Sequence, residues 1–141
     1  MSNDSTSTQR IIVGVDGSAN AQKAANWAVA HAKAGDTIVL ISAWKDIIIP
    51  AEMAVSYSYD DSSARQVLAA EVARVSALAA NDLTIASDFQ HADPRTAILG
   101  QAGDLIVVGA RGHGGIAGLL LGSVADYVSR HAKVPVVIVP K

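Results

Sequence analysis

Residues 104–131, DLIVVGARGHGGIAGLLLGSVADYVSRH, decide the fold class of this chain. The stretch begins with an apolar run over 104–109, which is typical of a buried strand, and it ends with a helical pattern over 123–131. Residues 109–123 hold six of the eleven glycines of the chain. A strand, a glycine-rich connection and a helix in this order indicate an α/β domain.

The same alternation of strand and helix extends through the rest of the chain. Apolar or alternating runs predict strands at 11–15, 37–43, 84–90 and 135–139, and helical spacing predicts helices at about 21–34, 61–80 and 93–103. We expect Asp93 to be an N-cap with Pro94 at the first helical position, and Gly35 to follow the end of the first helix. Parallel strands need crossover connections, so this order predicts an open five-stranded parallel sheet with helices on both faces.

Two segments fall outside this alternation. Residues 1–9 are polar and rich in Ser and Thr, which predicts a flexible tail before a single domain over 10–141. Residues 45–60 show no clear period, which predicts a long irregular connection of the kind that often has a functional role.

Composition excludes several classes of protein. A chain of 141 residues is the size of one domain, and 50% hydrophobic with 17% charged residues is not the composition of a disordered chain. The net charge of −2 argues against nucleic-acid binding, and the absence of cysteine excludes disulfides, thiolate metal sites and a cysteine nucleophile. The polar N-terminus lacks the apolar core of a secretory signal, and no apolar run approaches the ~18 residues of a membrane span. We therefore expect a cytoplasmic protein without a membrane segment.

The glycine-rich stretch has the chemistry of a phosphate cradle. Glycines let the main chain approach a ligand, successive amides can form an anion-binding nest, and the start of the next helix adds unpaired N–H groups. A Walker loop is excluded because residues 109–123 contain no lysine. The Gly-x-Gly-x-x-Ala pattern at 112–117 follows the fourth strand rather than the first, which argues against a dinucleotide fingerprint.

The spacing that remains is Gly-x2-Gly-x9-Gly-Ser, formed by Gly109, Gly112, Gly122 and Ser123. Together with VGVDGS at 13–18, this spacing closely resembles the nucleotide-binding branch of the universal stress protein family. The resemblance implies a Rossmann-like sheet of strand order 3-2-1-4-5 and a site for ATP, with ADP or AMP as alternatives. A bound nucleotide would normally bring Mg²⁺, held mostly through phosphates and water.

The resemblance also implies a role for particular residues. The adenine or ribose region is contacted by Asp16 and its neighbours Gly14 and Val15, the base by Ala43, and the base and ribose from the other side by Val108 and Gly109. The triphosphate is surrounded by Gly112, Gly122, Ser123 and Val124. Because aromatic residues are scarce, we expect aliphatic and backbone groups, rather than a ring, to hold the base.

Four side chains in or near the expected site have alternative interpretations. Asp16 fits a turn that caps the residues after it, and Ser123 with Asp126 fits a capping box at the start of a helix. Arg111 is either a phosphate partner or a solvated loop cation, and His113 is better explained as a solvent-facing loop residue.

The residues do not indicate dedicated catalysis. The four histidines are scattered, and neither Ser18 nor Ser123 has a base beside it in the sequence, so we expect at most slow ATP hydrolysis. The expected function is a nucleotide-responsive stress factor. The alternatives are a ligand-free interaction scaffold of the same fold, a slow ATPase and, less favoured because its phosphate loop would follow another strand, a flavin carrier.

The last strand raises the question of a partner. In the order 3-2-1-4-5 residues 136–139 form an apolar edge, and a bare edge is an aggregation risk. Members of the family commonly pair this strand with its copy, so the resemblance implies a homodimer through Val136, Val137 and Ile138.

Overall fold

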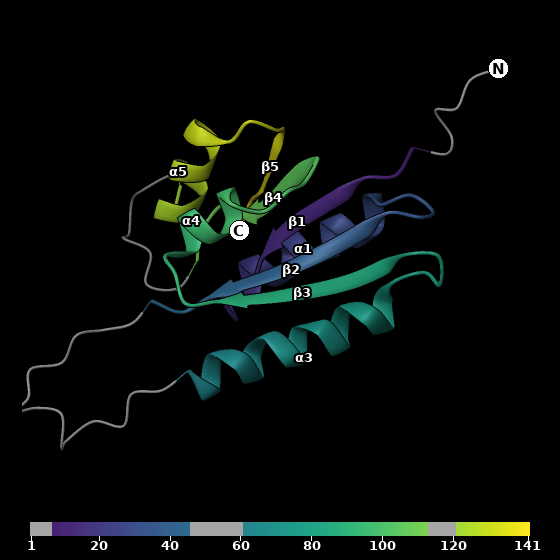
Figure 1. Cartoon of the computed structure of the whole chain (residues 1–141), viewed down its shortest axis with the longest axis horizontal. Coiled ribbons are helices and arrows are strands. Elements are labelled where there is room, and N and C mark those ends of the chain that lie inside the picture. Colours follow the sequence, from purple (N-terminus) through teal and green to yellow (C-terminus); the bar gives the residue numbers. More distant parts are fainter. Residues whose placement is uncertain (1–6, 46–60, 113–120) are drawn as a thin grey trace, which may run out of the picture.

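The computed structural model describes residues 7–45, 61–112 and 121–141. Strands and helices alternate along them (Figure 1). Their bounds are β1 Arg10–Gly14, α1 Ala19–His31, β2 Thr37–Ala43, α3 Ser62–Leu78, β3 Thr84–Gln90, α4 Pro94–Leu99, β4 Leu105–Gly109, α5 Ser123–His131 and β5 Val136–Val139. The irregular connection predicted at 45–60 falls outside the described residues, except for its first position. So do His113 and most of the glycine-rich stretch.

The strands form one parallel sheet, as the alternation of strands and helices predicted, in the order β3-β2-β1-β4-β5 that the resemblance implied. The register places Val13 of β1 between Leu40 of β2 and Val107 of β4. These three side chains are fully buried, which explains why the central strands are continuous apolar runs.

Two hydrophobic clusters cover the two faces of the sheet. On one face α1 and α3 pack through small or branched side chains such as Ala24, Ala28 and Val75. On the other face α4 and α5 pack through Ala97, Ile98, Ala125 and Val128. The alanine-rich composition therefore allows helices to lie close to the sheet on both sides.

Two predicted helix ends are wrong. The first helix ends at His31, and Gly35 instead adopts φ +88° in the turn before β2. Asp36 explains the early end because its buried carboxylate accepts from the N–H groups of Gln9 and Lys33, each at 2.8 Å, which draws the chain into a tight turn. The helix predicted to reach residue 103 ends at Leu99.

The start of α4 is confirmed. Asp93 is its N-cap and accepts from the N–H of Arg95 at 2.9 Å, with Pro94 in the first turn.

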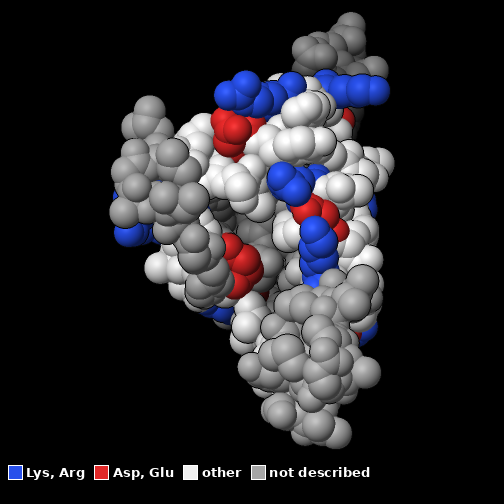
Figure 2. Space-filling view, turned by 90° about the vertical axis from the view of Figure 1, so that its left-hand side faces the viewer, with Lys and Arg blue, Asp and Glu red and all other residues white. Residues whose placement is uncertain are grey.

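Because all strands are parallel, their carboxyl ends meet at one edge of the sheet, which Figure 2 shows as a hollowed face rimmed by charged side chains of both signs.

Candidate functional site

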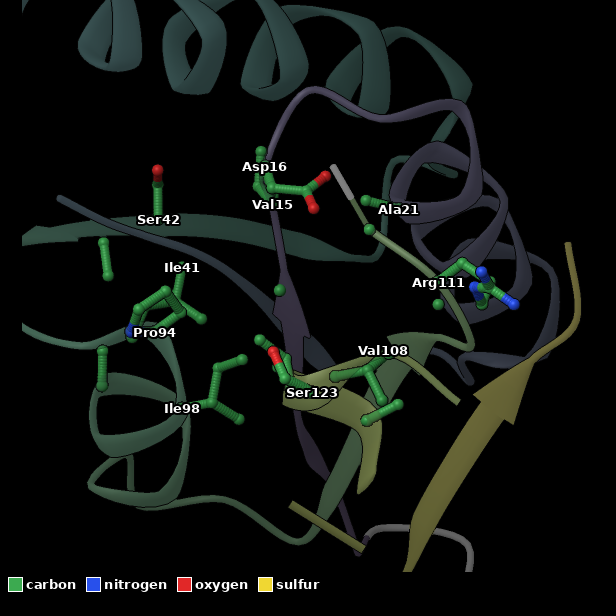
Figure 3. Close-up of a pocket in the computed structure, with 18 of the residues that line it drawn as sticks. Val15, Asp16, Ala21, Ile41, Ser42, Pro94, Ile98, Val108, Arg111 and Ser123 are labelled. Carbon is green, nitrogen blue, oxygen red and sulfur yellow. The ribbon is translucent and has the colours of Figure 1, made fainter. Parts of the chain in front are cut away.

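A pocket of about 920 Å³ opens at the carboxyl ends of β1, β2 and β4 (Figure 3). This is the edge where open parallel sheets bind their ligands, at the point where the strand order reverses. All eleven residues predicted to form a nucleotide site line this pocket. They are Gly14, Val15, Asp16, Ala43, Val108, Gly109, Arg111, Gly112, Gly122, Ser123 and Val124. The structure thus brings together two stretches that are about a hundred positions apart in the chain, and the ligand contacts of these residues stay a prediction.

One side of the pocket is apolar. Ile41 from β2, Pro94 and Ile98 from α4 and Val108 from β4 surround this part (Figure 3). Gly14 belongs to the same wall, because a Cβ there would lie 3.1 Å from the Cδ1 of Ile98. These side chains offer an apolar surface to a ligand.

Asp16 has the turn role that its sequence position suggested, and it also lines the pocket. Its Oδ1 accepts from the N–H of Ser18 at 2.8 Å, and Gly17 between them adopts φ +83°. Its Oδ2 lies against Gly112, where a Cβ would come within 2.7 Å of that oxygen. The exposed carboxylate therefore stands between the end of β1 and the glycine-rich stretch, so the two interpretations do not exclude each other.

The predicted capping box at Ser123 is wrong. The N-cap of α5 is Gly122, whose carbonyl accepts from the N–H of Asp126 at 3.0 Å, and no side chain caps this end. The N–H of Gly122 donates to the carbonyl of Ala110 at 2.6 Å, which holds Gly122 at the start of the helix, and the predicted span of 123–131 is confirmed. Ser123 is thus the first helical residue, and its side chain lines the pocket (Figure 3).

Arg111 lies at the margin of the pocket. In Figure 3 its guanidinium is well apart from both Asp16 and Ser123. Its main-chain N–H donates to the Oδ1 of Asn20 at 2.7 Å. The contact between the Arg111 side chain and a phosphate stays a prediction that this geometry does not itself support.

The sequence interpretation missed several pocket residues. Trp44 follows β2 directly and lines the pocket, so an aromatic side chain is present there. That aliphatic and backbone groups hold the base stays a prediction. The position of Trp44 one residue after a predicted strand was the available signal. Pro94, Ala97 and Ile98 could not be found in this way, because only the packing of α4 beside the pocket brings them to it.

The strongest resolved pKa shift near the pocket belongs to Asp93, beside the lining residue Pro94. The side-chain hydrogen bonds from Arg95, at 2.9 Å, lower the pKa of Asp93 from 3.8 to about 2. Arg95 also lies over the ring of Tyr127 on α5, 5.0 Å from the ring centroid. The carboxylate stays ionised at neutral pH and holds the start of α4 against α5.

The three histidines within the described residues have structural partners. His31 and His131 each stack on the ring four residues earlier and bond to the carbonyl of the same residue, Trp27 at 2.8 Å and Tyr127 at 2.9 Å. His91 pairs with Asp61 at 2.8 Å. Within 7–45, 61–112 and 121–141, the structure holds no group of three or more acidic, histidine or cysteine residues that could bind a metal ion. Across the same ranges, no helix is long and apolar enough to cross a membrane.

Comparison with known proteins decides the family. Residues 7–140 match the model of the universal stress protein family. The chain belongs to this family. Among curated relatives, universal stress protein Rv2623 from Mycobacterium tuberculosis is 31% identical over 131 residues, which cover 91% of this chain and 44% of that protein. This universal stress protein chain thus spans less than half the length of the curated relatives it matches.

Solved structures of the family have the same fold. A universal stress protein from Archaeoglobus fulgidus, 21% identical, superposes with a TM-score of 0.72 over 92% of this chain and 97% of its own. A universal stress protein solved in complex with cAMP is 29% identical, with a TM-score of 0.61 over 93% of this chain and 95% of its own.

Proposed function

We propose that this universal stress protein binds ATP, with ADP or AMP as alternatives, and acts as a nucleotide-responsive regulatory factor. The observation that supports the proposal most is the meeting of the eleven predicted site residues, from distant parts of the chain, in one pocket of about 920 Å³. A pocket of this volume is within the range of small-molecule and cofactor sites.

The proposed ligand orientation follows from the chemistry of the walls. The base lies on the apolar side, between Ala43, Ile98 and Val108. The ribose lies beside the carboxylate of Asp16. The phosphates face Gly112 and the start of α5, where the first N–H groups of a helix have no partner within it and attract anions. The hydroxyl of Ser123 adds a donor at the same place.

A nucleotide would bring Mg²⁺ bound to its phosphates and to water. The acidic residues among the described pocket walls are Asp16 and Asp126, and Asp126 pairs with Arg130 at 3.1 Å. The residues present therefore fit a metal that enters with the ligand rather than one held by a protein cage.

The relative in complex with cAMP supports the ligand class, because it shares 29% of its residues with this chain over nearly its whole length. An adenine nucleotide is thus the first class of ligand to test. Titrations with ATP, ADP, AMP and cAMP, each in the presence of Mg²⁺, would rank the candidates by affinity.

The decisive experiment is calorimetric titration of the purified protein, freed of nucleotide by unfolding and refolding, with mass analysis of whatever is released. We expect saturable binding of Mg-ATP that weakens by about tenfold, or ~1.4 kcal/mol, in Asp16→Ala and in Ser123→Ala. Ser129→Ala is the matched control, since its hydroxyl lies on the same helix and donates to the carbonyl of Asp126. A flat titration up to millimolar ATP, with no nucleotide released, would favour the ligand-free scaffold instead.

We further propose that the protein acts as a homodimer through Val136, Val137 and Ile138. β5 is an edge strand that pairs with β4 on one side. The carbonyls of Pro135 and Val139 accept from β4 and the residue after it, at 3.0 and 2.8 Å. The alternation along a strand then directs the main-chain groups of Val136 and Ile138 outward, where a second copy could pair with them.

A further inference from the structure

Asn20 is a buried polar side chain that joins the glycine-rich stretch to the last strand. It lies in the first turn of α1 and is 6% exposed. Its Oδ1 accepts from the N–H of Arg111 at 2.7 Å. Its Nδ2 donates to the carbonyls of Val139 at 3.0 Å and Pro140 at 3.2 Å. All three partners are more than 90 positions away in the sequence.

The main chain leaving β4 is pressed against this side chain. A Cβ on Gly109 would lie 2.9 Å from both the Cγ and the main-chain oxygen of Asn20, so only glycine fits there without a shift. The next residue, Ala110, donates its N–H to the carbonyl of Val139 at 2.8 Å. Residues 109–111 are thereby fixed between α1 and the end of β5.

The same fixed point sets the other end of the glycine-rich stretch. The carbonyl of Ala110 accepts from the N–H of Gly122 at 2.6 Å, and Gly122 is the N-cap of α5. The place of Ser123 in the pocket therefore depends on where Ala110 lies. Asn20 is not among the residues that line the pocket, so any effect it has on a ligand passes through this main chain.

We propose that Asn20 is a positioning residue for the nucleotide site, which holds both described ends of the glycine-rich stretch in place by anchoring Arg111 to the end of β5. This inference rests on the proposed function for its ligand but not for its anchoring geometry. Asparagine suits the role because its amide both accepts and donates. Its oxygen accepts from the N–H after β4, and its nitrogen donates to the carbonyls at the end of β5.

Two substitutions test the anchor without adding bulk. Asn20→Ala removes all three hydrogen bonds, and Asn20→Ser keeps a small polar group that is too short to reach either partner. Asn26→Ala is the matched control, because Asn26 lies on the same helix and accepts from Arg74 on α3, away from the pocket. Val75→Ala is the stability control, because it removes buried side-chain volume from α3 and leaves the pocket walls unchanged.

Amide hydrogen exchange gives the readout that needs no ligand. In both Asn20 variants we expect the amides of Ala110, Arg111 and Gly122 to exchange at least about tenfold faster than in the unaltered protein, because their hydrogen bonds open more often. In Val75→Ala, any faster exchange at these amides should be no greater than the overall loss in the free energy of unfolding accounts for. Unchanged exchange at Arg111 in Asn20→Ala would overturn the proposal.

Nucleotide titration gives the second readout. We expect the Kd for Mg-ATP to rise about tenfold or more in both Asn20 variants, since a loosened supporting group misplaces the groups that touch the ligand. The Kd should stay within about twofold in Asn26→Ala and in Val75→Ala, even where Val75→Ala unfolds at a lower temperature. If the Kd for Mg-ATP rises in step with the loss in melting temperature across all four variants, the positioning role is overturned. If the unaltered protein binds no nucleotide, the proposed function fails, and the exchange experiment still decides whether Asn20 anchors the stretch.

Discussion

At the residue scale, Gly109 and Gly122 belong to the same spacing motif but are glycine for different reasons. Gly109 has no room for a side chain because Asn20 lies against it, whereas a Cβ on Gly122 would make ordinary contacts of 3.4 Å or more. Gly122 also has an extended φ of −69° that any residue adopts. One glycine is thus required by packing, and the other is required, if at all, by what binds in the pocket.

Gly109→Ala is expected to lower the free energy of unfolding by about 1–3 kcal/mol, the usual cost of overpacking. Gly122→Ala should change it by less than about 0.5 kcal/mol, because reduced freedom of the unfolded chain offsets a poorer N-cap. Urea unfolding of the two variants provides the comparison. Equal destabilisation of both would show that the crowding at Gly109 is relieved by a small shift.

At the element scale, α4 forms one wall of the pocket although it has only six residues. A helix this short is marginal by itself, so its N-cap and its packing have to hold it. Asp93 supplies the cap, and Arg95 holds the pKa of the Asp93 carboxyl down to about 2 through side-chain hydrogen bonds.

Asp93→Ala should reduce the free energy of unfolding at pH 7 by about 1 kcal/mol, the usual worth of an N-cap. Because the folded-state pKa is depressed, this stabilisation is present above the ordinary value of 3.8 and is lost as the pH falls toward 2. Urea titrations at pH 7 and near pH 2.5 should therefore show a difference between variant and unaltered protein that shrinks in acid. Asp126→Ala, which breaks an exposed pair with Arg130, is the control and should cost less than about 0.5 kcal/mol.

A partly buried ion pair lies at the contact between α1 and α3. Glu71 is 6% exposed, and both of its oxygens accept from Arg74 at 2.7 Å. Arg74 also donates to the side chain of Asn26 on α1 at 2.7 Å. The pair thereby joins the two helices that cover one face of the sheet.

Glu71→Ala is expected to destabilise the fold by about 1–2 kcal/mol, because the guanidinium of Arg74 loses two charged hydrogen bonds but keeps access to water, being 31% exposed. Arg65→Ala, which removes an exposed pair with Asp61, should stay within about 0.5 kcal/mol. Thermal and urea unfolding of both variants at neutral pH would measure the difference. A loss for Glu71→Ala no larger than for Arg65→Ala would contradict the stabilising role of the pair.

At the scale of the whole molecule, the strand order leaves β5 as an edge beside the pocket-forming strand β4. The same strand end receives the amide of Asn20, so the proposed dimer edge and the proposed nucleotide site share a support. Through this shared support, nucleotide binding in the pocket can alter the dimer edge, and dimerisation can alter the pocket.

Ile138→Pro removes an outward N–H from β5 and is expected to convert a dimer into a monomer in light scattering at micromolar concentration. Ile138→Ala keeps that N–H and loses only packing against the second hydrophobic cluster, so it should stay dimeric. An unaltered protein that is already monomeric at this concentration would refute the dimer.

The sequence by itself determined the fold class and predicted residues that line the pocket. Strands buried on both faces have to be apolar runs, so their places and the parallel sheet could be predicted, and the glycine spacing indicated which strand exit matters. The span of α5 was predicted correctly, but the cap was assigned to Ser123 because serine has the local chemistry of a cap, whereas the N-cap is Gly122, whose N–H donates to the distant carbonyl of Ala110.

Only the tertiary structure decided which residues meet. It brought α4 and Trp44 to the pocket, and it placed the side chain of Asn20 on an amide 91 positions away. No local pattern contains such contacts, because they depend on the register of neighbouring strands and on the packing of helices against them. Local patterns state which side of an element is buried, and the assembled sheet decides what that side is buried against.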